Sequence, residues 1–218
     1  MTGTGIGGLD RQMNARVFSL LIGYLSGCFL TAEFVARKYA GRSAAEIGDT
    51  GNPGMANIMA HLGFIPGILT LAGDLGKCVA ASLISYGLFR ESGWIVVLYA
   101  GLGCTLGHDF PFWRGFRGGK GVATSSVAIV LYSFLPGLIS NIAGMLVVLV
   151  TKYLCIGGPV IPAVFMVQMI WKSDPEAAAL GAIFTILSIY AHGSAVMNIR
   201  AGITKKTDVL SAILSRFR

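Results

Sequence analysis

Residues 94–124 read WIVVLYAGLGCTLGHDFPFWRGFRGGKGVAT, an apolar run that passes into a loop dense in glycine and positive charge. Other apolar runs recur from residue 17 to residue 199, only 12% of the residues are charged, and the mean hydropathy is +0.71. These runs are far longer than the alternating segments of about 10 residues that build an outer-membrane barrel. In hydrocarbon every backbone amide must be paired within the protein. The sequence therefore predicts an all-α, polytopic integral membrane protein.

The apolar runs predict a bundle of about seven transmembrane helices. They are expected at residues 17–39, 62–89, 94–106, 122–134, 138–152, 160–171 and 177–199. The third, fourth and sixth are short, because a helix needs about 20 residues to cross a bilayer. We expect one membrane-embedded catalytic domain at residues 17–200, a polar segment at 1–16 and a basic cytoplasmic tail at 201–218.

The seventeen Lys and Arg residues are unevenly divided between the two sides of such a bundle. Assigning successive connections to alternate sides puts four on one side and twelve on the other, with Lys77 inside a span. Lys and Arg accumulate in cytoplasmic loops, so the N-terminus is expected outside and the C-terminus in the cytoplasm. The net charge of +7 then reflects membrane topology, and no nucleic-acid partner is expected.

The loop around Lys120 has the composition of an anion-binding site. Gly118, Gly119 and Gly121 would let consecutive backbone amides turn toward one anion, and the helix expected next adds its dipole. The pattern is not a Walker A loop, because Arg114 stands where that motif needs glycine. The alternative is that the basic residues of this loop only anchor to anionic lipid headgroups.

A second glycine-rich loop, residues 48–57, has the same character. Gly51 and Gly54 permit unusual dihedral angles, and Asn52 and Asn57 offer amide donors. A bland tight turn is the alternative. Both loops are expected on the cytoplasmic side, where a site between them would receive anionic substrates.

Three ionisable residues inside the apolar runs are also candidates for function. Asp74 and Lys77 are three residues apart, so they would share a helix face, where they either serve the site or only stabilise helix packing. His192 could act as a general base near neutral pH, or be an interfacial histidine without chemistry. The four cysteines show neither a CxxC pair nor metal-ligand spacing, so they are expected to pack in the core, and no metal site is expected.

These residues carry a resemblance to a known family. Residues 107–111, GHDFP, and 118–124, GGKGVAT, resemble the central motif of the bacterial glycerol-3-phosphate acyltransferase family that uses acyl phosphate, the PlsY family. Residues 50–57 resemble its first-loop motif, Asp74 with Lys77 its second-helix pattern, and residues 198–200 part of its last motif.

The resemblance implies a reaction of phospholipid biosynthesis in the bacterial inner membrane. A fatty acyl group passes from acyl phosphate to the 1-hydroxyl of sn-glycerol 3-phosphate, giving lysophosphatidic acid and phosphate at the cytoplasmic face. An acyl phosphate is already activated, so the protein has mainly to hold two anions, orient the hydroxyl and stabilise the leaving phosphate. The expected partners are these two substrates and membrane lipids, and the chemistry requires no cofactor, nucleotide or metal.

The loop chemistry and the resemblance together give a set of site residues. The expected catalytic residues are His192, Lys120, Thr50 and Asn198. The expected substrate-binding residues are Gly51, Asn52, Gly54, Asn57, His108, Arg117, Gly118, Gly119, Gly121 and Thr124. His192 and Asn198 are six residues apart, so they would share a helix face only if the helix breaks, as Gly193 would allow.

The chain also departs from the family pattern. Ala56 and Ala60 stand where the family usually has Thr and Arg, and Ala195 replaces the Asn of the last motif. Cys155 and Gly158 replace two serines of the loop before the sixth helix. These losses support one alternative, a paralogue that binds lipid phosphate or acyl phosphate without turnover. A further alternative is a small anion or lipid transporter, in which the two glycine-rich loops form a cytoplasmic gate.

Overall fold

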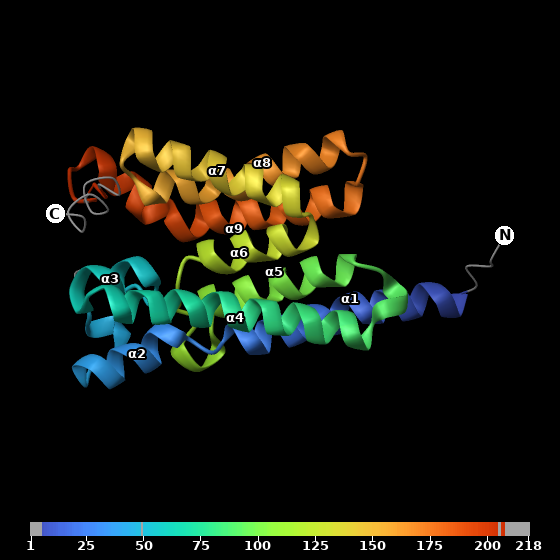
Figure 1. Cartoon of the computed structure of the whole chain (residues 1–218), viewed down its shortest axis with the longest axis horizontal. Coiled ribbons are helices and arrows are strands. Elements are labelled where there is room, and N and C mark those ends of the chain that lie inside the picture. Colours follow the sequence, from blue (N-terminus) through green and yellow to red (C-terminus); the bar gives the residue numbers. More distant parts are fainter. Residues whose placement is uncertain (1–5, 49, 205, 208–218) are drawn as a thin grey trace. The chain divides into compact units, whose positions relative to one another are not determined.

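The computed structural model of the chain describes residues 6–48, 50–204 and 206–207, and in these ranges every regular element is a helix (Figure 1). Parts of the predicted polar N-terminal segment and basic C-terminal tail, residues 1–5 and 208–218, lie outside the described residues. The predicted all-α class is confirmed.

Within the described part of the chain, six stretches are long and apolar enough to cross a membrane. They are Gly8–Ala40, Phe64–Leu88, Ile95–Arg114, Phe134–Thr151, Leu154–Trp171 and Pro175–Arg200. The predicted fourth span corresponds to the shorter apolar helix Val122–Tyr132. Its 11 residues rise only about 16 Å, roughly half of the hydrocarbon thickness.

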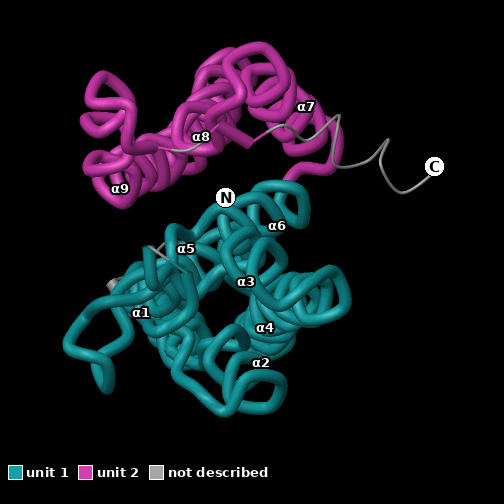
Figure 2. The backbone as a smooth tube through the Cα atoms, turned by 90° about the vertical axis from the view of Figure 1, so that its left-hand side faces the viewer, with its two compact units in different colours: residues 1–132 teal, residues 133–218 magenta. Residues whose placement is uncertain are grey.

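The chain forms two compact units, residues 1–132 and residues 133–218, which are described here separately (Figure 2). Unit 1 contains α1 (Ile6–Gly27), α2 (Thr31–Ala40), α3 (Met55–Leu62), α4 (Phe64–Leu88), α5 (Ile95–Asp109) and α6 (Val122–Tyr132), with short 3-10 turns at Ala44–Glu46, Arg90–Ser92 and Phe112–Arg114. Unit 2 contains α7 (Phe134–Thr151), α8 (Leu154–Trp171) and α9 (Pro175–Arg200).

The predicted span at residues 17–39 lies inside the candidate span Gly8–Ala40, but it is not one continuous helix, because the chain breaks between α1 and α2. The carbonyl oxygens exposed by the break find donors far away in the sequence. The Lys77 ammonium donates to the carbonyls of Gly27 (3.3 Å) and Phe29 (2.8 Å), and Trp113 Nε1 donates to the carbonyl of Cys28 (2.8 Å). Irregular backbone at membrane depth is stable only with such partners.

Glycines bring α1 and α5 into backbone contact. A Cβ atom at Gly23 or Gly27 of α1 would overlap the carbonyls of Ala100 or Cys104, and one at Gly103 or Gly107 of α5 would overlap the carbonyls facing it from α1. Each pair of glycines is spaced four residues apart, the small-xxx-small pattern of close helix packing in membranes. This contact holds the C-terminal end of α5 against α1.

In unit 2, polar side chains join α7 to α8. Gln168 Nε2 donates to the carbonyl of Pro136 (3.1 Å) and to Ser140 Oγ (2.9 Å). The helix α8 begins at Leu154, six residues before the predicted start of the span at residue 160, and contains Pro159 and Pro162. Gly157 allows this extra turn to approach α7, where a Cβ would overlap Val148.

A buried carboxylate holds the segment that leads into the first glycine-rich loop. Glu33 on α2 accepts hydrogen bonds from the amide of Ala44 (2.9 Å), from Ser43 Oγ (3.0 Å) and from Arg37 Nε (2.8 Å). Only 8% of Glu33 is exposed. The start of this loop is therefore fixed to α2.

We expect the substitution Glu33→Ala to lower the free energy of unfolding by about 2 kcal/mol, because the buried amide of Ala44 loses its acceptor. Thermal unfolding in detergent measures the loss. The matched control is Glu91→Ala, since the Glu91 side chain is 88% exposed and lies 3.9 Å from Arg11, and it should change stability little. Equal losses in the two variants would contradict the structural role of Glu33.

Candidate active site

Both glycine-rich loops lie at the same end of unit 1, toward the left in Figure 1. The helix α4 starts at this end, next to α3. The helix α5 packs against α4 and brings the chain back to the same end. The first loop joins α2 to α3, and the second joins α5 to α6. Residues about 60 positions apart in the chain are thus presented at one end of a helix bundle.

The backbone amides of Gly118 and Gly119 donate hydrogen bonds to carbonyl groups at the end of α5. Gly118 N donates to the carbonyl of Asp109 and Gly119 N to the carbonyl of His108, each at 2.9 Å. The prediction that these two amides face an anion is therefore wrong. These positions need glycine for close approach, because a Cβ would overlap the His108 carbonyl at Gly118 and the His108 ring at Gly119.

The turn after Lys120 starts α6 at the predicted residue, Val122. Gly121 has φ +61°, and a Cβ there would lie 2.6 Å from Thr105 Cγ2 and 2.9 Å from both carboxylate oxygens of Asp109. Lys120 is half-buried, two residues before the helix. A lysine therefore stands just before the N-terminal end of α6, where a helix dipole favours anions.

Thr124, expected to bind substrate, lies in the packing between α5 and α6. Its side chain is fully buried, donates to the carbonyl of Gly121 (3.1 Å) and accepts from Thr105 Oγ1 (3.0 Å). A direct substrate contact of Thr124 stays a prediction. Thr124 stabilises the start of α6.

The predicted pair of Asp74 and Lys77 is a cluster of three groups. Lys77 Nζ lies 2.9 Å from Asp74 Oδ1 and 2.9 Å from His108 Nδ1, and the same His108 nitrogen lies 3.6 Å from Asp74 Oδ1. An ammonium can only donate, so His108 Nδ1 accepts and its proton is on Nε2. His108 is 4% exposed and lies directly beneath Gly119.

The first loop is stabilised by Asn57, which lies on the unpredicted helix α3. Asn57 Nδ2 donates to the carbonyl of Ile47 (2.8 Å), and Thr50 Oγ1 donates to Asn57 Oδ1 (3.4 Å). Gly51 has φ +54°, and a Cβ there would lie 2.5 Å from the carbonyl of Ala45. Asn57 is 8% exposed and mainly structural, whereas Thr50 is exposed.

The remaining loop residues differ in exposure. Asn52 and Gly54 are half-buried just before α3, and Asn52 N donates to Thr50 Oγ1 at 3.4 Å. Arg117 is exposed, directly before Gly118. Thr50 and Arg117 are therefore exposed in these loops, whereas Asn52 and Lys120 are half-buried.

His192 and Asn198 belong to unit 2 and lie on different faces of α9. The helix is continuous from Pro175 to Arg200, so six residues separate the two side chains by about 240° around the axis. His192 is 3% exposed, whereas Asn198 is exposed. The break at Gly193 that would bring them together is absent from α9.

A hydrogen bond within α9 sets the tautomer of His192. Its Nδ1 lies 2.9 Å from the carbonyl of Ser188, an acceptor, so Nδ1 carries the proton of the neutral ring. The lone pair is then on Nε2. A fixed tautomer of this kind suits proton abstraction.

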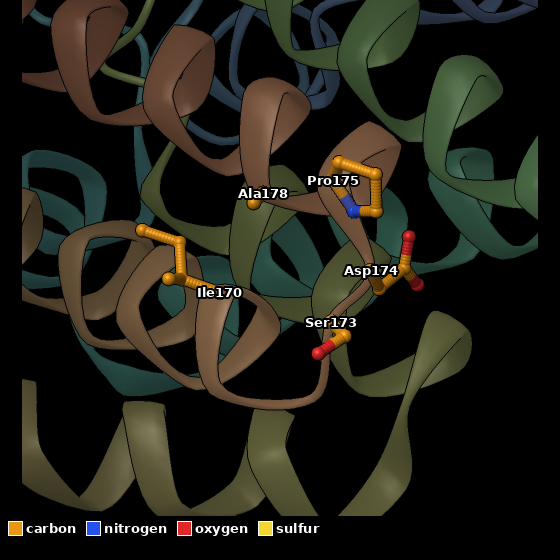
Figure 3. Close-up of a pocket in the computed structure, with 5 residues that line it drawn as sticks. All are labelled: Ile170, Ser173, Asp174, Pro175 and Ala178. Atoms are coloured by element: carbon orange, nitrogen blue, oxygen red, sulfur yellow. The ribbon is translucent and has the colours of Figure 1, made fainter.

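A hollow at the turn between α8 and α9 is not the site (Figure 3). It is lined by Ile170, Ser173, Asp174, Pro175 and Ala178. None of the predicted site residues lines it, and the Asp174 carboxylate accepts from the amide of Ala177 (3.1 Å), which caps α9. Among the described residues no group of three or more His, Cys, Asp or Glu side chains could hold a metal ion.

Comparisons with known proteins agree with this architecture. Residues 17–202 match the model of the family described as glycerol-3-phosphate acyltransferase. Glycerol-3-phosphate acyltransferase 1 of Lactobacillus acidophilus is 37% identical over 199 residues, covering 91% of this chain and 95% of its own. Glycerol-3-phosphate acyltransferase of Shouchella clausii is 32% identical over 195 residues, covering 87% and 95%.

A solved structure has the same fold. The crystal structure of PlsY, an integral membrane glycerol 3-phosphate acyltransferase in its glycerol 3-phosphate form, superposes with a TM-score of 0.78 at 26% identity. The superposition covers 91% of this chain and 98% of PlsY. The relatives favour an enzyme over a non-catalytic paralogue or a transporter. The chain therefore belongs to the glycerol-3-phosphate acyltransferase family and is a membrane-embedded acyltransferase.

Proposed function

We propose that the protein transfers a fatty acyl group from acyl phosphate to the 1-hydroxyl of sn-glycerol 3-phosphate, releasing lysophosphatidic acid and phosphate. The observation that carries this proposal is the position of Lys120. Its loop is attached to the end of α5 by two amide hydrogen bonds, and it precedes the start of α6 by two residues. A positive charge near a helix N-terminus suits the phosphate that leaves an acyl phosphate.

In the proposed reaction the hydroxyl oxygen of glycerol 3-phosphate attacks the acyl carbonyl carbon. The bond between that carbon and the phosphate oxygen breaks, and phosphate leaves with both electrons of the bond. The hydroxyl proton passes to His192 Nε2 or to a phosphate oxygen of the substrate. Lys120 stabilises the negative charge that develops on the leaving phosphate.

In this proposal the first glycine-rich loop binds glycerol 3-phosphate, through its phosphate or through the attacking hydroxyl. Thr50 and Asn52 offer a hydroxyl and an amide on the loop between α2 and α3, and Arg117 adds positive charge on the loop of Lys120. Gly51, Gly54 and Asn57 give this loop its shape, and Gly118, Gly119, Gly121, His108 and Thr124 shape the second loop. Asn198 stays a predicted catalytic residue, on another face of α9 than His192.

The proposal places the site at the cytoplasmic face of a bacterial inner membrane, with the N-terminus outside and the C-terminus inside. The excess of Lys and Arg on one side of the spans supports this orientation. The proposal keeps residues 17–200 as one membrane-embedded catalytic domain. The fatty acyl chain lies among apolar helix faces.

The choice of acyl donor tests the proposal. Purified protein in lipid nanodiscs is given glycerol 3-phosphate with palmitoyl phosphate, palmitoyl-coenzyme A or a palmitoylated acyl carrier protein. We expect lysophosphatidic acid only from palmitoyl phosphate, with one phosphate released for each product molecule. Product from a thioester donor but not from palmitoyl phosphate would overturn the proposal.

We expect His192→Ala to lower kcat by about 10²-fold and to change the KM for glycerol 3-phosphate little, because a general base acts in the transition state. Steady-state release of phosphate measures both constants. The control is Ser194→Ala, an exposed position two residues further along α9, which should retain wild-type kcat. Unchanged turnover in His192→Ala would assign the proton to the substrate phosphate.

A further inference from the structure

Lys77 is a buried cation with four polar contacts in unit 1. Its side chain is 7% exposed and contacts groups from three places in unit 1. It donates to the carbonyls of Gly27 and Phe29 at the break between α1 and α2, pairs with Asp74 on its own helix, and donates to His108 on α5. Lys77 Nζ lies 3.3 Å from the Gly27 carbonyl and 2.8 Å from the Phe29 carbonyl. It lies 2.9 Å from both Asp74 Oδ1 and His108 Nδ1.

One side of this cluster leads to the first glycine-rich loop. The carbonyls of Gly27 and Phe29 define where α1 ends and α2 begins. The helix α2 then holds the start of the loop through the Glu33 carboxylate, which accepts from Ser43 and Ala44. The orientation of α2, and with it of the loop that carries Thr50, depends on the geometry of the break.

The other side of the cluster leads to the second glycine-rich loop. Gly119 N donates to the carbonyl of His108, and the absent Cβ of Gly119 leaves the space that the His108 ring occupies. Trp113, which lies in the same connection, donates to the carbonyl of Cys28 inside the break. The ring and backbone of His108 therefore form the surface on which the residue before Lys120 rests.

A buried ammonium needs such partners to be stable, and a neutral side chain would leave the Asp74 carboxylate buried without its cation. A charge buried to this extent in a membrane span is a functional hypothesis by default. A simple pair with Asp74 would stabilise only α4. The additional hydrogen bonds of Lys77 reach the break between α1 and α2 and reach His108 on α5. Each of these two segments leads to one of the proposed substrate loops.

We propose that Lys77 is a positioning residue that holds the helix break and His108 in one arrangement, and so sets the two glycine-rich loops relative to each other. This proposal rests on the proposed function, because it takes the two loops to be the substrate-binding elements. Lys77 touches no substrate. It acts through His108 on the loop of Lys120.

The test compares wild type, Lys77→Met and the double variant Asp74→Asn/Lys77→Met. The double variant removes both charges, so it avoids an unpaired buried carboxylate and should fold even if the single variant does not. We expect the KM for glycerol 3-phosphate to rise about tenfold in the folded variants, with a smaller change in kcat. The control is Lys172→Met, an exposed lysine after α8, which should retain wild-type constants.

A second measurement does not depend on the acyl donor. Hydrogen exchange, followed by mass spectrometry of peptides that cover residues 116–122, reports the amides of Gly118 and Gly119. We expect these amides to exchange about tenfold faster in the double variant, while peptides from α7 and α8 are unchanged. A wild-type enzyme that fails with palmitoyl phosphate would overturn the proposed donor and leave this result valid.

The proposal would be overturned by a double variant with wild-type KM and wild-type exchange at Gly118 and Gly119. That outcome would show that Lys77 only neutralises the charge of Asp74. A variant that is less stable but has an unchanged KM and unchanged local exchange would also contradict a positioning role. Both outcomes are distinguishable from loss of the folded protein by thermal unfolding.

Discussion

Replacing Lys120 by alanine is expected to lower kcat/KM for glycerol 3-phosphate by about 10³-fold. The Lys120 ammonium precedes the N-terminal end of α6 by two residues, and its loop is attached to α5 by the amides of Gly118 and Gly119. Removing it takes a full positive charge from the proposed leaving phosphate. Steady-state formation of lysophosphatidic acid and phosphate measures the loss.

The control separates a specific contact from the general positive field of this end of the molecule. Lys38 is an exposed lysine near the end of α2, and Lys38→Ala removes the same charge. It should lower kcat/KM less than about threefold, because exposed charges are screened by salt. Similar losses in both variants, or activity within about tenfold of wild type in Lys120→Ala, would contradict the proposed role of Lys120.

The second large effect concerns stability. Gly103→Ala is expected to lower the free energy of unfolding by about 3 kcal/mol, or to prevent folded protein from accumulating. The new Cβ would overlap the carbonyl of Leu20 and lie 2.8 Å from the amide nitrogen of Tyr24. Backbone atoms of α1 cannot move aside, so the helices must separate. Thermal unfolding in detergent and the yield of monodisperse protein measure the effect.

A glycine in the middle of α4 provides the matched control. Gly76 is exposed, and a Cβ there would meet nothing within 4 Å. Gly76→Ala should leave the free energy of unfolding unchanged or raise it by about 0.5 kcal/mol, because alanine has the higher helix propensity. Equal destabilisation of the two variants would show that the close contact of α1 and α5 is not what makes Gly103 necessary.

The sequence by itself determined the all-α membrane class and the approximate positions of the helices. Both follow from the length and composition of apolar runs, which are local properties of the chain. The start of α6 at Val122 was also predictable, because Gly121 ends an irregular loop and an apolar run follows it. The motifs around Lys120 and Thr50 were sufficient for the resemblance to the family.

Only the tertiary structure decided where the first predicted helix breaks and which loop groups are available to a substrate. Residues 17–39 give no sign of the break, because its carbonyls are paired with Lys77 and Trp113, about 50 and 85 residues away. The amides of Gly118 and Gly119 look available in the sequence, yet both donate to the end of α5. Hydrogen-bond partners so distant in the chain are set by helix packing, which no local pattern encodes.

The same reason explains why the surroundings of His192 and His108 could not be predicted. The continuity of α9 through Gly193 places Asn198 away from the face of His192, and α4 brings Lys77 to His108, so that this ring supports a loop. Residue types and spacing identified the candidates for chemistry. Their hydrogen-bond partners depend on which helices lie side by side, and in a membrane that choice is made by backbone contacts such as those of Gly23 and Gly103.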